Sequence, residues 1–210
     1  MATANRATPH ATPHPTLFLG HSFVRRASQH LLSSNQSNLN LPLATHDVMF
    51  QFRGGAHIAD IMHLYRKAPN FNPDIVVIDI GTNDLFNFTN TPSHSLALQL
   101  FDTARHLVQH CGVRHVIILE VLPRTTWGRF GAPQSFSSRV ARFNTMLKSL
   151  VSQHQESTPI SFWFHKGILA DVSQFILDGC HLNPAGMTKY LKSVRRAILF
   201  QTRALRRPSN

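Results

Sequence analysis

The chain has 210 residues, of which 42% are hydrophobic and 15% charged, a composition typical of one globular domain with a full hydrophobic core. No apolar run approaches the roughly 18 residues needed to span a bilayer, which argues against a transmembrane protein. The formal net charge of +11 indicates either an anionic partner or substrate, or a surface whose charge keeps the protein soluble.

The N-terminal segment, residues 1–15, is a low-complexity run of Ala, Thr, Pro and His that we predict to be a disordered tail. It contains no apolar stretch of the kind that a signal peptide requires. We therefore expect an intracellular, cytoplasmic protein whose domain spans residues 16–202.

Short apolar runs alternate with longer segments of helical periodicity along this domain. A parallel sheet of five strands, covered by helices on both faces, is the simplest fold for such alternation. We therefore predict an α/β protein with a three-layer α/β/α, flavodoxin-like, doubly wound sheet. In chain order the elements are a strand at 16–20, a helix at 23–32, a loop at 33–42, a strand at 47–52, a helical pattern at 58–65, a strand at 74–81, a helix at 93–110, a strand at 113–123, a helix at 136–153, a strand at 159–164 and a helix at 184–200.

Basic residues gather at the C-terminal end, where we predict a basic tail over residues 203–210. A basic terminal helix and tail more often contact a partner or solvent than an active site, so a weak anionic partner is a possibility here. The oligomeric state is not indicated. The arginines of this region are Arg195, Arg196, Arg203, Arg206 and Arg207.

Ser22 follows the first predicted strand and lies at the start of a helix. In doubly wound sheets, ligands bind beyond the carboxyl ends of the strands. A helix N-terminus offers free backbone N–H groups and partial positive charge, which favour negative charge developing near the serine. Taken alone, Ser22 is better explained as a helix N-cap.

Two further strand ends carry candidate hydrogen-bond donors. Asn83, in the segment GTND after the third strand, has a side-chain amide that can donate into a site. Gly55, after the second strand, can bring a bare backbone N–H close to a substrate oxygen, and Gly54 is the alternative. Each of these segments taken alone is also typical of an ordinary turn.

Asp178 and His181 stand three residues apart, just before the last predicted helix. This spacing lets the carboxylate reach the imidazole and fix its tautomer. With 14 histidines in the chain, a lone surface histidine is the competing interpretation. No HExxH motif or close Cys/His pair is present, and the two cysteines are too few for a zinc site, so we expect no metal and no cofactor.

Together these four segments resemble the SGNH/GDSL hydrolase family. The similar blocks are LFLGHSF, FRGGAHI, IDIGTNDL and DGCHLNPAG, which lie in the family's order and span residues 16–200. The resemblance implies that Ser22 is the nucleophile, His181 the general base and Asp178 its partner. It also implies an oxyanion hole made by the backbone N–H groups of Ser22 and Gly55 and the side chain of Asn83.

The first block departs from the family pattern, because His21 replaces the aspartate that usually precedes the serine. This change makes the surroundings of Ser22 less negative, and Arg25 follows one helical turn later. We therefore expect His21, Arg25 and Gly54 to contact a substrate with an anionic part. Phe86 and Trp127, in the long loops 84–94 and 124–135, are candidates for an apolar cleft, although packing of these loops onto the core explains them as well.

The sequence thus predicts a serine esterase that hydrolyses acyl or acetyl esters of a small molecule, lipid or glycan. The alternative is an inactive module of the same fold that binds lipid, glycan or nucleic acid, since fold alone does not determine function. A basic nucleic-acid-binding protein is a third interpretation, but the chain lacks the interleaved aromatics and reading motifs typical of that class.

Overall fold

The computed structural model describes residues 13–86, 91–124, 126–127, 130–131, 134–168 and 176–205. A few of these are described by their backbone alone, namely Ser37, Thr126, Trp127, Phe130, Gly131, Gln134 and Ser135. Among the described helices, none is both long enough and apolar enough to cross a membrane.

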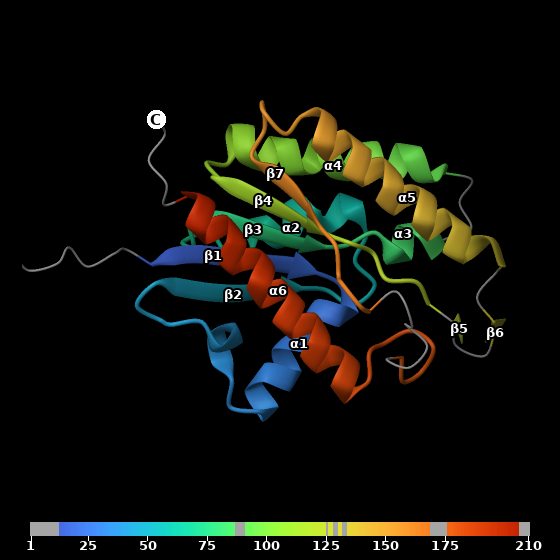
Figure 1. Ribbon diagram of the computed structural model, residues 1–210, viewed down its shortest axis with the longest axis horizontal. Coiled ribbons are helices and arrows are strands. Elements are labelled where there is room, and N and C mark those ends of the chain that lie inside the picture. The colour runs from blue at the N-terminus through green and yellow to red at the C-terminus, as the bar shows by residue number, and fades with distance from the viewer. Residues whose placement is uncertain are drawn as a thin grey trace, which may run out of the picture.

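A five-stranded parallel sheet forms the centre of the molecule (Figure 1). Its spatial order is β2-β1-β3-β4-β7, which is that of a doubly wound sheet starting from β1. The strands are short runs of β-branched and aromatic residues, which suit a sheet buried on both faces. Their bounds are β1 His14–Gly20, β2 His46–Phe52, β3 Ile75–Asp79, β4 His115–Leu119 and β7 Ile160–Trp163.

Helices cover both faces of the sheet and complete three layers (Figure 1). Alternate residues of β3 point to opposite cores: Val76 and Ile78 pack with α2, α4 and α5, whereas Ile75 and Val77 pack with α1 and α6. The helices are α1 Ser22–Ser33, α2 Ile61–Arg66, α3 Thr82–Phe86, α4 Ser93–His110, α5 Gln134–Gln153 and α6 Pro184–Leu205, with 3-10 turns at Ser37–Asn40 and Ile58–Asp60 and a small hairpin of β5 Thr126–Trp127 and β6 Phe130–Gly131.

The register brings the ends of three strands together. Gly20, the last residue of β1, lies opposite Phe52 of β2 and Asp79 of β3. A Cβ atom on Gly20 would lie 2.2 Å from Cγ2 of Val24 and 2.8 Å from the carbonyl oxygen of Asp79. Only glycine therefore allows the chain to turn from β1 into α1 this close to β3, and the loops after β1, β2 and β3 leave from one edge of the sheet.

The predicted three-layer architecture and five-stranded parallel sheet are confirmed, and several predicted boundaries move. β1 starts at His14, inside the predicted disordered tail, because the backbone N–H of His14 bonds the carbonyl of Thr45 and its ring lies 2.8 Å from Asp74. α6 continues to Leu205, so the first residues of the predicted basic tail are helical. Residues 1–12 and 206–210 lie outside the described residues.

The helix α3 is absent from the sequence prediction, which assigned GTND to a turn and residues 84–94 to a loop. The backbone N–H of Leu85 bonds the carbonyl of Gly81, which begins a helical turn. Gly81 has φ of 130°, a conformation that suits glycine, and a Cβ there would lie 3.0 Å from Cζ of Phe143. The turn-forming residues therefore serve a sharp strand-to-helix connection.

Candidate active site

Three side chains lie in hydrogen-bond contact beyond the carboxyl end of β1, namely those of Ser22, His181 and Asp178. Nε2 of His181 is 3.0 Å from Oγ of Ser22, although 159 residues separate the two in sequence. Nδ1 of the same ring is 2.8 Å from Oδ2 of Asp178. The imidazole thus connects a hydroxyl on one side with a carboxylate on the other, a geometry in which it can accept the hydroxyl proton.

The backbone of the loop before α6 holds this carboxylate and imidazole in place. Oδ1 of Asp178 accepts the N–H groups of Cys180, at 3.0 Å, and His181, at 2.6 Å. The N–H of Leu177 donates to the carbonyl of His181 at 2.7 Å, and Gly179 has φ of 76°, which lets the loop reverse direction. The sequence DGCH therefore forms a closed turn that presents both side chains toward α1.

The protonation states of the pair suit a base and its partner. Partial burial by itself raises the pKa of Asp178, but hydrogen bonds from the side chain and backbone of His181 and the backbone of Cys180 lower it to about 2. Burial lowers the pKa of His181 below 6.5, the hydrogen bond with Asp178 opposes this shift, and the charge of Arg26 adds to it. At neutral pH the carboxylate is therefore ionised and the imidazole neutral.

Ser22 is the first residue of α1 and does not cap it. The N-cap is His21, whose Nδ1 accepts the backbone N–H of Phe23 at 3.3 Å. The hydroxyl of Ser22 is consequently free to contact His181. Its backbone N–H belongs to the first helical turn, where N–H groups have no partner within the helix.

His21, which we expected to contact substrate, lies beneath the site, and that expectation is corrected. The side chain is 1% exposed, and its Nε2 lies 3.6 Å from Oδ1 of Asp79, whose other oxygen accepts the hydroxyl of Tyr190. Burial, with smaller effects of Arg124 and His181, lowers the pKa of His21 to about 3. Burial raises the pKa of Asp79 to about 6 against the opposing effects of Tyr190 and Arg124. His21 is thus a neutral, buried support for the helix start.

The loops after β2 and β3 are joined beside the serine. Nδ2 of Asn83 donates to the carbonyl of Ala56 at 2.9 Å, which leaves its second N–H for another acceptor. The carboxylate of Asp84 accepts the N–H of Ile58 at 3.1 and 3.2 Å. Gly55 precedes Ala56, is exposed and has φ of 73°, and the space where its Cβ would lie is open. The predicted donors therefore stand on two connected segments, Gly55 in the loop after β2 and Asn83 at the start of α3.

Arg124, which the sequence prediction missed, is the buried cation of the site. It is 4% exposed, and its Nη2 donates to Oδ1 of Asn83 at 2.8 Å. Burial lowers its pKa, whereas the nearby Cys180, Asp178 and Asp79 raise it. The signal in the sequence was a charged residue directly after the apolar run VLP that follows β4.

The remaining predicted substrate contacts have different surroundings. Arg25 is exposed, and its Nη1 would lie 3.9 Å from a Cβ added to Gly54, so these two residues are neighbours on the outer side of the site. Phe86 is 6% exposed and packs edge-on against Phe136, so the structure supports the core interpretation for this ring. The side chain of Trp127 lies outside the described residues.

Within the described part of the chain, no group of three or more His, Cys, Asp or Glu side chains is arranged to hold a metal ion. The candidate site thus consists of a hydroxyl, an imidazole, carboxylates, an amide and an arginine. These groups suit proton transfer and the stabilisation of negative charge.

Comparison with known proteins identifies the family. The chain belongs to the GDSL-like lipase/acylhydrolase family, whose model matches residues 18–189. A multidomain esterase of Ruminococcus flavefaciens is 26% identical over 119 residues, which cover 57% of this chain and only 15% of that protein. The chain therefore corresponds to a small part of that relative.

Solved structures share the fold. A GDSL-like lipase of Bacteroides thetaiotaomicron is 19% identical, with a TM-score of 0.67 over 91% of this chain and 92% of that one. A catalytic mutant of an acetylxylan esterase from Geobacillus stearothermophilus is 14% identical, with a TM-score of 0.63 over 90% and 95% of the two chains. The family model thus confirms the predicted family, and these structures confirm the predicted fold.

Asp178 and Arg26 shift the pKa of His181 in opposite directions, which gives a test of the geometry. Asp178→Asn removes a charge and a hydrogen bond that raise this pKa, so we expect it to fall. Arg26→Gln removes a charge that lowers it, so we expect it to rise. NMR titration of the histidine ring signals, with His181→Gln to assign the resonance, measures both shifts. Shifts of the same sign in the two variants would contradict this arrangement.

Proposed function

We propose that this protein is a serine esterase that hydrolyses carboxylic esters through Ser22, His181 and Asp178. The observation that carries the proposal is the 3.0 Å distance between Nε2 of His181 and Oγ of Ser22, with Asp178 on the opposite ring nitrogen. A nucleophile, a base and a group that orients the base form the recurring unit of such catalysis.

In the first half of the reaction, Ser22 becomes acylated. His181 takes the hydroxyl proton at Nε2 as Oγ attacks the ester carbonyl carbon, and the carbonyl oxygen becomes an oxyanion. The tetrahedral intermediate then expels the alcohol oxygen, which takes the proton from His181. Asp178 stabilises the transient imidazolium and holds Nδ1 in its protonated tautomer.

In the second half, water removes the acyl group. His181 accepts a proton from the water molecule as its oxygen attacks the acyl carbon, and a second oxyanion forms. When that intermediate collapses, the bond to Oγ breaks and Ser22 recovers its proton from His181. The products are one carboxylic acid and one alcohol, and the enzyme returns to its starting state.

The oxyanion is stabilised, in this proposal, by the backbone N–H groups of Ser22 and Gly55 and by the second N–H of Asn83. Arg124 is a positioning residue for the amide. A guanidinium only donates hydrogen bonds, so it can face only the oxygen of Asn83, and the amide nitrogen must then face the other way. The bond from Nδ2 to the carbonyl of Ala56 agrees with that orientation. The buried charge of Arg124 also favours an oxyanion nearby.

The proposed substrate is an acetyl or longer acyl ester of a small molecule, lipid or glycan. The relative from Ruminococcus flavefaciens is named an esterase, in agreement with an ester substrate. Exposed Arg25 beside Gly54 supplies positive charge at the rim of the site, which suits a substrate that carries an anionic group. The net charge of +11 acts in the same direction.

The alternative, a non-catalytic binding module on the same fold, is less well supported. A binding module has no need of a neutral imidazole held between a hydroxyl and an ionised carboxylate, and the hydrogen bonds of His181 with Ser22 and Asp178 therefore favour the esterase. Labelling of the serine separates the two functions directly.

Replacement of the nucleophile tests the proposal. We expect Ser22→Ala to abolish hydrolysis of p-nitrophenyl acetate and to prevent labelling by a fluorophosphonate probe, because both reactions require Oγ. Ser28→Ala, on the same helix α1, is the matched control and should retain activity and labelling. Unchanged turnover in Ser22→Ala, or a label on another residue in the wild-type protein, would refute the proposal.

Replacement of Asn83 and Arg124 tests the oxyanion hole. Loss of one donor typically reduces kcat by about 10²–10³, and we expect this from Asn83→Ala with little change in KM. Arg124→Met should reduce kcat by a smaller factor, and Arg124→Lys should recover part of the loss.

The double variant Asn83→Ala/Arg124→Met distinguishes positioning from independent action. If Arg124 acts through the amide of Asn83, Arg124→Met should reduce kcat by a much smaller factor when Asn83 is already replaced by Ala than when Asn83 is present. Fully additive losses in kcat would show that Arg124 does not act by holding Asn83. Circular dichroism of each variant controls for folding.

A further inference from the structure

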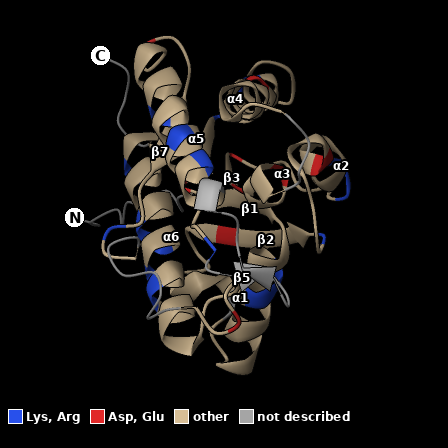
Figure 2. Ribbon diagram, turned by 90° about the vertical axis from the view of Figure 1, so that its right-hand side faces the viewer, with Lys and Arg blue, Asp and Glu red and all other residues tan. Residues whose placement is uncertain are grey.

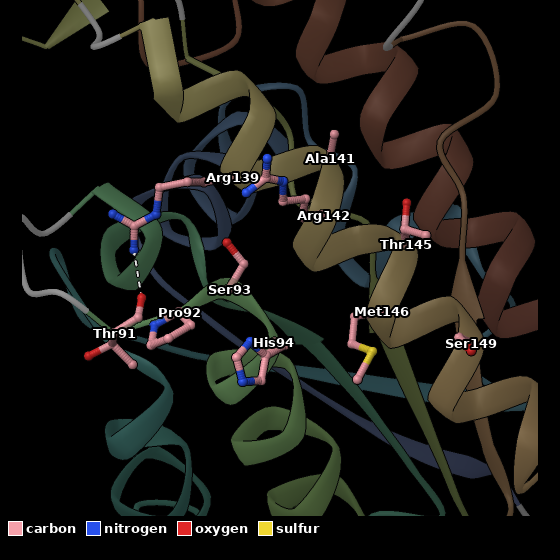
Figure 3. A pocket seen from close by; sticks show the side chains of 10 residues that line it. All are labelled: Thr91, Pro92, Ser93, His94, Arg139, Ala141, Arg142, Thr145, Met146 and Ser149. Carbon is pink, nitrogen blue, oxygen red and sulfur yellow. Dashed lines mark hydrogen bonds between the residues drawn. The ribbon is translucent and has the colours of Figure 1, made fainter.

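A cleft of about 870 Å³ lies between α4 and α5, and none of the proposed catalytic side chains lines it (Figure 3). Residues at and just before the start of α4 form one wall, and residues from the middle of α5 form the other. The volume falls within the range typical of sites for small organic ligands.

The wall formed by α5 is basic. Nη2 of Arg139 donates to the carbonyl of Thr91 at 3.0 Å, which fixes this side chain across the mouth of the cleft, and Arg142 reaches toward the same side (Figure 3). No carboxylate is among the described residues that line the cleft, and neither arginine forms an ion pair with any of the described residues. The helix α5 contains basic and no acidic residues, which Figure 2 shows as blue bands without red ones.

The opposite wall contributes the N-terminus of an 18-residue helix. The N-cap of α4 is Pro92, which makes no side-chain capping hydrogen bond, and the first turn contains no acidic residue. Its first N–H groups have no partner within the helix, so this end presents donors and partial positive charge to the cleft.

Ser93 gives an independent indication of a ligand. The residue is only 8% exposed and lines the cleft, and its hydroxyl forms no hydrogen bond with any described residue. Figure 3 shows this hydroxyl directed toward the two arginines. This hydroxyl is therefore open to the cleft and available to bond a ligand there.

We propose that this cleft binds the phosphate group of a small phosphorylated molecule. Two guanidinium groups, a hydroxyl and a helix N-terminus are more donors than the two oxygens of a carboxylate can satisfy, whereas a phosphate monoester offers three oxygens and nearly two negative charges. The cleft exceeds the size of phosphate alone, and Ala141 and Met146 provide apolar surface for an organic part. The site is separate from the proposed esterase site and does not depend on it.

Calorimetric titration of the full chain with butyl phosphate, in phosphate-free buffer at low ionic strength, tests this site. We expect saturable binding at one site in competition with inorganic phosphate, and binding at least about tenfold weaker in Arg142→Gln, since a charge-assisted contact is lost. Ser93→Ala should also weaken binding. Arg196→Gln, which removes the same charge from an exposed position on α6, should bind within about twofold of wild type.

Three results would overturn the proposal. If Arg142→Gln and Arg196→Gln weakened butyl phosphate binding equally, the effect would come from net charge alone. If binding did not saturate, the cleft would not be a specific site. Equal affinity for butyrate and butyl phosphate would exclude selectivity for phosphate. Thermal melts of all variants control for folding, and hydrolysis of p-nitrophenyl acetate by Arg142→Gln should equal that of wild type, because this residue lies outside the proposed catalytic site.

Discussion

The parallel pairing of β1 with both of its neighbours is the constraint on which the site depends. Because Gly20 lies level with Phe52 and Asp79, the loops that follow β1, β2 and β3 emerge side by side at one edge of the sheet. The turn before α6 then meets this edge and brings His181 to Ser22. Tight packing of Val24 and the Asp79 carbonyl around Gly20 leaves no freedom for that meeting point to move.

A balance of opposite charges stabilises this end of the sheet. Arg124 is buried close to the carboxylates Asp79 and Asp178, and a buried cation without such neighbours would be strongly destabilising. His21 stands where the family usually has an aspartate and is neutral, so the cation of Arg124 is compensated by Asp79 from beneath and by Asp178 from above. The histidine at position 21 therefore differs from the family pattern in the buried part of the site, and the solvent-facing groups are unaffected.

The sequence alone predicted the sheet from the order of its elements, and it predicted the meeting of Ser22 with His181 through the resemblance to the SGNH/GDSL family. Alternating strands and helices lead to a parallel sheet, and parallel strands deliver their following loops to one edge. The direction of a side chain at that edge depends on tertiary neighbours, and here the prediction failed. His21 was expected beside the substrate, but it caps α1 from below. For Phe86, both a cleft and packing on the core were left open, and it packs on Phe136.

Arg124 shows a second limit of sequence reasoning. Its role depends on a hydrogen bond to a residue 41 positions away, and no local periodicity encodes such a contact. The segment GTND was ambiguous for a related reason: Asn83 and Asp84 favour turns locally, but their side chains bond the backbone of the loop after β2 and so permit a short helix.

A crystal structure of the protein after reaction with diethyl p-nitrophenyl phosphate would test the central claim most directly, since the phosphoryl group imitates the tetrahedral intermediate. The account predicts phosphorus bonded to Oγ of Ser22, with one phosphoryl oxygen within about 3 Å of the N–H of Gly55 and of Nδ2 of Asn83. An adduct on another residue, or a phosphoryl oxygen directed away from both donors, would contradict it.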